Sequence, residues 1–307
     1  MSRRSPEAPG ASGFLVVDKP RGWTSHDVVD AARRWLGTRR IGHLGTLDPM
    51  ATGVLPLAVR EATKLAPFLP EGDKAYTGEI ELGAETDTLD AEGRVLRRHE
   101  GELPSEPALR AALKGFVGEI LQVPPMYSAV KRAGVPLHRL ARAGQEVTRA
   151  PKKVRISRLE LISWSPPRAR VEVLCSTGTY VRSLAADLGA ALGCGAFLAA
   201  LRRTRSGGFR IEAAAEVGAL EREAREGRLA ARLIPPVNAL ELPVVRLEAP
   251  DERSVRNGNP VTLAGAPLPA GGRVAALGRA GELVAVLEIR PGRRLQPLRV
   301  LGSGSGS

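Results

Sequence analysis

A single carboxylate, Asp48, stands in the middle of residues 41–57, a segment with neither helical nor strand periodicity. Glycines and prolines punctuate this segment at Gly42, Gly45, Pro49, Gly53 and Pro56. An aspartate before a proline is commonly a turn residue, because its side chain hydrogen-bonds its own backbone. A carboxylate that is held on a loop and shielded from water can instead act as a nucleophile or transfer a proton. Asp48 is therefore the first candidate for a catalytic residue.

The remaining residue types exclude several kinds of chemistry. The histidines do not form a His-Glu-x-x-His pattern, and Cys175 and Cys194 are too far apart in sequence for a paired metal motif. We expect two free buried thiols, and a disulfide between them is the alternative that the sequence leaves open. The sequence also lacks a Walker-type loop and a dinucleotide-binding fingerprint. We therefore expect an enzyme without metal or cofactor. Isomerisation and hydrolysis fit this expectation, whereas electron transfer does not.

The charge balance points to an anionic partner. Lysine and arginine number 45 against 33 acidic residues, which gives a net charge of +12. Such an excess favours nucleic acid, and it is concentrated between Lys131 and Arg155, where Glu146 is the only acidic residue. No apolar stretch is long enough to cross a bilayer, and the N-terminal residues lack the apolar run that a signal peptide needs, so we expect a cytoplasmic protein without a membrane partner.

Periodicity and capping residues predict alternating strands and helices. Ser25 is the predicted cap of a helix that reaches Leu36. The predicted strands cover residues 14–17, 76–82, 154–162 and 169–175; the other predicted helices cover residues 105–116 and 183–192, and an acidic turn covers 85–90. After Pro235 and Pro236 the chain changes to short apolar runs broken by glycine and proline, which predict a small β-rich module.

Several segments resemble, in order, the motifs of the TruB family of tRNA pseudouridine synthases. The longest is the segment 42–57, which reads GHLGTLDPMATGVLPL and resembles the catalytic signature of the family. The others are VDKPRGWTS at 17–25, KAY at 74–76, GAETDTLD at 83–90, PPMYSAVK at 124–131, GTYVRSL at 178–184 and LRRT at 201–204. Together they span about residues 14 to 210.

The resemblance implies a fold, an activity and a catalytic group. The fold is α+β, with a mixed, largely antiparallel sheet flanked by helices. The activity is isomerisation of the uridine at position fifty-five, in the T-arm loop of tRNA, to pseudouridine. Asp48 is implied as the catalytic carboxylate, and Arg182 keeps it charged by lowering its pKa. Asp90 is a second anchor of the same network.

The same resemblance implies residues that hold the extruded base, since a stacked base cannot react. Tyr76 stacks on the base and is a candidate for the proton-transfer base. Tyr180 and Leu201 line the pocket, while His43 fills or braces the gap left in the RNA. Lys19 and Pro20 support the wall of the site. Two further substrate-binding residues, Lys131 and Arg132, belong to a basic insertion at residues 124–152 that closes over the RNA.

The predicted organisation has four parts. Residues 1–12 are expected to be disordered, 13–238 form the catalytic domain, 240–301 form a small β-barrel-like PUA-type RNA-binding domain, and 302–307 are a flexible tail. Three alternatives remain open: a guide-RNA-dependent enzyme that modifies ribosomal RNA, an RNA-binding chaperone that folds tRNA without chemistry, and a hydrolase with an aspartate nucleophile. The compact C-terminal module favours the stand-alone enzyme, for which we expect no obligatory protein partner.

Overall fold

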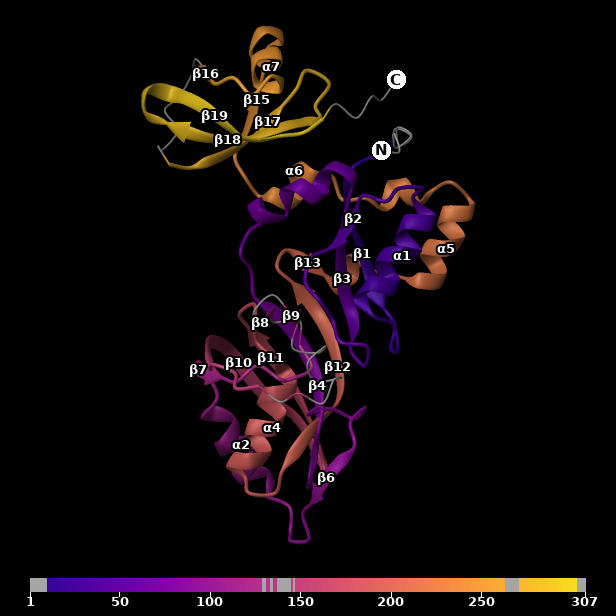
Figure 1. Ribbon diagram of the computed structural model, residues 1–307, viewed down its shortest axis with the longest axis vertical. Coiled ribbons are helices and arrows are strands. Elements are labelled where there is room, and N and C mark those ends of the chain that lie inside the picture. Colours follow the sequence, from indigo (N-terminus) through magenta and orange to yellow (C-terminus); the bar gives the residue numbers. More distant parts are fainter. Residues whose placement is uncertain are drawn as a thin grey trace.

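The chain folds into two β-sheets placed end to end along the long axis of the molecule (Figure 1). The computed structural model describes residues 10–128, 131–132, 135–136, 145, 147–262 and 271–302. The larger sheet has ten strands and the smaller sheet has five. No helix in the described ranges is long and apolar enough to span a membrane.

The ten-stranded sheet has the strand order β14-β1-β3-β12-β4-β11-β10-β7, with β2 paired to β3 and β13 paired to β12. Only the pairs β1–β14 and β3–β12 are parallel, so the predicted mixed, largely antiparallel sheet is confirmed. The bounds of its strands are β1 Gly13–Lys19, β2 Ile41–His43, β3 Thr52–Val59, β4 Lys74–Leu82, β7 Gly118–Gln122, β10 Lys152–Ser165, β11 Arg168–Cys175, β12 Ala196–Ser206, β13 Phe209–Arg210 and β14 Ala215–Glu216. Two hairpins accompany it: β5 Ala84–Thr86 with β6 Val95–Arg98, and β8 Lys131–Arg132 with β9 Val135–Pro136.

The sequence predicted only β1, β4, β10 and β11 of this sheet. Its other strands, β2, β3, β7, β12, β13 and β14, were not predicted. Residues 41–57 were predicted to be irregular, yet Thr52–Val59 is a strand in which every residue after Thr52 is buried. A strand buried on both faces has a continuous apolar sequence and does not show the alternation that marks a half-exposed strand. The strands pack closely, since a Cβ at Gly53 would lie 2.2 Å from the carbonyl oxygen of Arg203.

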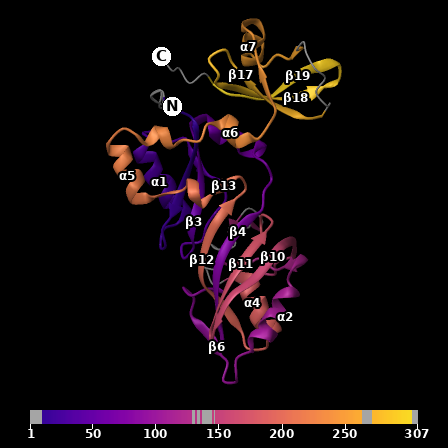
Figure 2. The ribbon, with the colours of Figure 1, turned by 180° about the vertical axis from the view of Figure 1, so that it is seen from behind.

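Helices pack against the ten-stranded sheet. Helices α2 (Glu106–Lys114) and α4 (Val181–Ala191) pack on each other and against β10 and β12, as Figure 2 shows from behind. Helix α1 (Ser25–Trp35) packs against α5 (Val217–Arg225), and both helices contact β1. The 3-10 segments are η1 Arg60–Phe68, η2 Ile211–Ala213, η3 Leu229–Arg232 and η4 Pro291–Arg293.

Two predicted helix starts were wrong by one or two residues. Thr24, and not Ser25, caps α1: its hydroxyl accepts from the Asp27 amide while the Asp27 carboxylate accepts from the Thr24 amide. Ser25 is thereby free for a long-range contact. Helix α4 begins at Val181 and not at Ser183, so Arg182 lies inside its first turn.

The five-stranded sheet has the order β15-β17-β18-β19-β16. Helix α7 (Ala249–Arg256) packs against this sheet. Its strands are β15 Val244–Arg246, β16 Val261–Thr262, β17 Arg273–Leu277, β18 Leu283–Arg290 and β19 Arg294–Val300, and α6 Pro236–Leu240 precedes it. One apolar cluster includes Phe14 and Val16 of β1 together with Val286 and Leu301 of the C-terminal part. The two sheets therefore share a core at their junction.

Candidate active site

A pocket of about 210 Å³ opens between the loop residues 46–48, the start of β4 and the start of α4. Five residues that the sequence assigned to the site line this pocket together: Asp48, Tyr76, Tyr180, Arg182 and Leu201. They come from segments up to about 150 positions apart in the sequence, and the ten-stranded sheet brings them together. The structure therefore brings these five residues together around one pocket.

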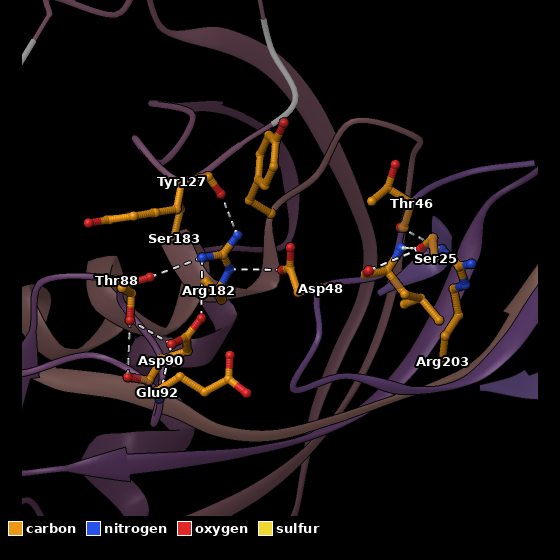
Figure 3. A network of polar contacts seen from close by, with 12 residues as sticks. Ser25, Thr46, Asp48, Thr88, Asp90, Glu92, Tyr127, Arg182, Ser183 and Arg203 are labelled. Atoms are coloured by element: carbon orange, nitrogen blue, oxygen red, sulfur yellow. Dashed lines mark hydrogen bonds and ion pairs between the residues drawn. The ribbon is translucent and has the colours of Figure 1, made fainter. Parts of the chain in front are cut away.

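Arg182 is the centre of the polar network in this pocket (Figure 3). Its Nε lies 2.9 Å from Asp48 Oδ2, an ion pair whose angle falls short of a hydrogen bond. Its Nη1 donates to Asp90 Oδ2 at 3.2 Å and to the Thr88 carbonyl at 3.1 Å, and its Nη2 donates to the Tyr127 carbonyl at 2.8 Å. The side chain is only 4% exposed, so its orientation is fixed by these contacts.

Asp90 is held by hydrogen bonds on the side away from Arg182. Its Oδ1 accepts from the Thr88 hydroxyl at 2.6 Å and from the Glu92 amide at 3.1 Å. These bonds close the acidic turn around the carboxylate and leave Oδ2 directed at Arg182. One guanidinium therefore lies between two carboxylates, of which Asp90 is buried and Asp48 faces the pocket.

The first turn of α4 is fixed by a contact that the sequence did not reveal. The Gln122 side chain at the end of β7 donates to the Tyr180 carbonyl at 3.0 Å and accepts from the Tyr180 amide at 2.7 Å. The Ser183 hydroxyl donates to the Val123 carbonyl at 3.1 Å. Helix α4 has no side-chain N-cap. These bonds to the end of β7 and to the residue after it therefore fix the start of the helix and, with it, the position of Arg182.

The loop that carries Asp48 is held by two buried side chains. The Ser25 hydroxyl donates to the Leu47 carbonyl at 3.1 Å and accepts from the Leu47 amide at 2.9 Å. Arg203, which is fully buried, donates to the carbonyls of Gly45, Thr46 and Val54 at 3.1, 3.2 and 2.7 Å. The sequence analysis assigned Ser25 to a helix cap, and it assigned neither Ser25 nor Arg203 to the site. Leu201 and Arg203 lie two positions apart on β12 and therefore face the same side of the strand. This alternation is the feature of the sequence from which the position of Arg203 could have been predicted.

Burial, more than charge, sets the pKa of Asp48. The side chain keeps a third of its surface exposed because it faces the pocket, yet the protein around it removes enough water to raise its pKa. Arg182 opposes this shift, and the negative charge of Asp90 adds to it. Arg182 thus lowers the pKa of Asp48 as the sequence analysis expected, but desolvation outweighs the ion pair and the net shift is upward.

Tyr76 is buried beside Arg203, and burial raises the pKa of its hydroxyl to about 12. The positive charge of the Arg203 guanidinium opposes the shift in the pKa by stabilising the phenolate. At neutral pH the hydroxyl is therefore protonated, and Arg203 is the group that makes its deprotonation less costly.

Lys19, Pro20 and His43 lie outside the residues that line the pocket. Lys19 is fully buried, and its ammonium donates to the carbonyls of Pro20, Trp23 and Pro49 at 3.0, 2.6 and 3.2 Å. Because Pro49 follows Asp48, this contact braces the wall of the site, and it leaves no donor for RNA. His43 lies on β2 with its Nδ1 buried and without a hydrogen bond to any described residue, and burial lowers its pKa.

The side chains of Lys131 and Arg132 lie outside the described residues, as does most of the predicted insertion. Their backbone forms β8, which pairs with β9. Cys175 and Cys194 are free and buried, which confirms the prediction. In the described ranges no three histidine, cysteine, aspartate or glutamate side chains are grouped closely enough to hold a metal ion.

Comparison with known proteins gives consistent results along the chain. Residues 33–181 match the model of the TruB family pseudouridylate synthase N-terminal domain, and residues 182–241 match that of the tRNA pseudouridylate synthase B C-terminal domain. The tRNA pseudouridine synthase B of Stutzerimonas stutzeri (strain A1501) is 44% identical over 296 residues, covering 95% of this chain and 96% of that protein. The protein of the same name from Ralstonia nicotianae (strain ATCC BAA-1114 / GMI1000) is 46% identical over 281 residues, covering 90% of this chain and 88% of that protein.

Solved structures show the same fold. A crystal structure of a Cbf5-Nop10-Gar1 complex matches with a TM-score of 0.68 and 28% identity, covering 94% of this chain and 84% of that chain. An H/ACA RNP bound to a substrate RNA containing 2′-deoxyuridine matches with a TM-score of 0.70 at 24% identity, covering 99% and 92% of the two chains, and this likeness concerns the fold alone. The polar network, the fold and the relatives agree, and the chain belongs to the TruB family of pseudouridine synthases.

Proposed function

We propose that this protein isomerises the uridine at position fifty-five of tRNA, in the T-arm loop, to pseudouridine, with Asp48 as the catalytic carboxylate. The observation that carries the proposal is the pairing of Asp48 with the buried Arg182 at 2.9 Å, at the edge of a pocket that also contains Tyr76. The curated relatives named above are tRNA pseudouridine synthases B, which supports tRNA as the substrate.

The reaction breaks the bond between C1′ of the ribose and N1 of uracil and forms a bond between C1′ and C5. The proton that leaves C5 is balanced by the proton that N1 gains, so no co-reactant is consumed. An ionised Asp48 can add to the uracil ring or act at the sugar, and both routes require its negative charge. Arg182 orients the carboxylate and opposes its protonation.

The pocket is suited to a single extruded base. Tyr76, Tyr180 and Leu201 supply apolar and aromatic surface around Asp48, which offsets the cost of unstacking the base, about a few kcal/mol. Because the pKa of Tyr76 is about 12, its hydroxyl is protonated at neutral pH, and the main role of the side chain is to stack on the base. Its action as a proton-transfer base depends on Arg203, which stabilises the phenolate.

RNA contacts extend beyond this pocket in the proposal. Lys131 and Arg132 of the basic insertion bind phosphates, His43 braces the RNA where the base has left, and the five-stranded sheet at 244–300 enlarges the contact surface. A stand-alone enzyme is favoured over a guide-RNA-dependent one, since the tRNA pseudouridine synthases B named above are 44% and 46% identical and the Cbf5 complex only 28%.

The test is incubation with an unmodified tRNA transcript followed by mapping of pseudouridine at nucleotide resolution. We expect one pseudouridine, in the T-arm loop, and none with Asp48→Asn. The Asp48→Asn protein should bind the transcript with wild-type affinity, because no RNA phosphate contact is removed. Full turnover by Asp48→Asn would refute the assigned nucleophile. Release of free uracil would indicate a hydrolase, and improved tRNA folding without any pseudouridine would indicate a chaperone.

A further inference from the structure

A second hollow of about 580 Å³ lies directly beside the active-site pocket. Consecutive residues separate the two spaces: Gly45 and Thr177 line the hollow, while Thr46 and Gly178 line the pocket. Lys74, the first residue of β4, lines both. The remaining walls of the hollow include Leu44, Phe209 and Ile234. A chain that reaches the pocket through the hollow therefore passes the Lys74 side chain.

The ammonium of Lys74 lies close to a second cation. A Cβ at Gly45 would be 3.3 Å from Lys74 Nζ and 3.8 Å from Arg203 Nη1, so both cations lie within 4 Å of one point on the catalytic loop. The guanidinium of Arg203 donates its hydrogen bonds to carbonyl groups and forms no ion pair within the described part of the chain. Two neighbouring positive charges thus lack a carboxylate between them.

No described residue compensates the charge of Lys74. No hydrogen bond or ion pair joins its ammonium to the part of the chain that the structure describes, although Glu71 and Glu241 line the same hollow. Burial and the charge of Arg203 lower the pKa of Lys74 to about 8. The nearby Cys175 is no counterion, because burial raises the pKa of its thiol to about 11 and keeps it neutral.

We propose that Lys74 binds the backbone phosphate of the substrate RNA that links the nucleotide in the active-site pocket to its neighbour in the adjacent hollow. The proposal rests on the proposed function, since it takes the pocket to hold the reacting nucleotide. An uncompensated, half-buried ammonium is costly in the free protein, and an incoming phosphate supplies the missing negative charge. The contact fixes the strand at the point where it enters the pocket.

Lys74→Gln removes the charge and keeps a chain that can hydrogen-bond. We expect its affinity for an unmodified T-arm RNA to fall by about tenfold to a hundredfold, as for loss of one charge-assisted contact, and the slope of log K against log salt to decrease by about 0.7. Lys74→Arg should retain most of the affinity. The matched control is Lys114→Gln at the exposed end of α2, which should bind as the wild type does.

A neutral phosphate identifies the contact. A T-arm RNA is made with a methylphosphonate on the 5′ or the 3′ side of the target uridine, with 2′-O-methyl groups beside it so that no hydroxyl cleaves the linkage. The reference RNA carries the same 2′-O-methyl groups and a normal phosphate. At one of the two positions the wild type should bind the methylphosphonate RNA more weakly than the reference RNA. Lys74→Gln should bind the two RNAs with the same, already reduced, affinity.

Two results would overturn the assignment: wild-type affinity and salt slope in Lys74→Gln, or equal losses for wild type and variant at both methylphosphonate positions. Circular dichroism and thermal unfolding of each variant separate a folding defect from a binding defect, and Lys74→Arg provides the answer if the glutamine variant does not fold. Failure of the proposed function is distinguishable, because the wild type would then form no pseudouridine in the T-arm loop of the unmodified transcript.

Discussion

Replacing Arg203 with methionine tests whether the catalytic loop is positioned from β12. Methionine occupies a similar space without the guanidinium, so the carbonyls of Gly45, Thr46 and Val54 lose their donor. Val54 is fully buried, and its unpaired carbonyl costs about 1–3 kcal/mol. The other two carbonyls belong to a partly exposed loop that water can reach, so they add less. Removing a buried cation offsets part of this loss, since burial already lowers the pKa of Arg203. We expect the free energy of unfolding to fall by about 2–3 kcal/mol.

The effect of Arg203→Met on turnover should exceed its effect on stability. The loop keeps its attachment through Ser25 but can move relative to Arg182, and a displacement of about 1 Å in a reacting group costs on the order of a hundredfold in rate. The assay is single-turnover pseudouridine formation at saturating tRNA, with urea unfolding measured in the same buffer.

Arg202→Met is the matched control for Arg203→Met. Arg202 is 43% exposed and pairs with Asp18, with Nη2 2.6 Å from Oδ2. An exposed ion pair contributes up to about 1 kcal/mol, so this variant should unfold almost as the wild type does. A folded Arg203→Met protein with the wild-type rate at saturating tRNA would refute the positioning role.

Three further substitutions test other parts of the site. Asp48→Asn should be more stable than the wild type at neutral pH. Because folding raises the pKa of Asp48, the ionised carboxylate disfavours the folded state above that pKa, and the advantage should shrink in urea unfolding as the pH falls toward 3.8. Ser25→Ala removes two buried hydrogen bonds to Leu47 and should cost about 1–2 kcal/mol of unfolding free energy, together with a lower single-turnover rate; an unchanged rate would contradict the role of the contact. Gln122→Leu removes both bonds to the Tyr180 backbone and should slow turnover without changing the salt dependence of RNA binding, whereas a changed salt slope would mean that Gln122 also affects phosphate contacts.

The residues that face the pocket were predictable from the sequence because they occur in short, ordered motifs. Asp48, Tyr76, Arg182 and Tyr180 were assigned in this way, and the structure places them around one pocket. The resemblance also gave the α+β fold, because its motifs span most of the larger domain.

The residues behind the pocket were not predictable in the same way. Ser25 has the type of a helix cap and lies next to the true cap, so only its contact with Leu47 reveals that it holds the loop. Arg203 follows Arg202 in sequence, and their different roles depend on which face of β12 each residue occupies. Strand β12 was not predicted, so the alternation of buried and exposed residues along it could not be used to assign Arg203 to the site. Long-range contacts of this kind become visible only when the sheet is assembled.

The apolar cluster at the junction of the two sheets has a practical consequence for engineering. Leu301 and Val286 cover Phe14 and Val16 of β1, and the Gly302 amide donates to the Glu61 carboxylate at 2.8 Å. A shortened enzyme that ends near residue 241 would expose this apolar surface and would tend to aggregate. A minimal version of the catalytic half therefore needs polar replacements on the outer face of β1, and its purification would show whether that surface alone accounts for the loss of solubility.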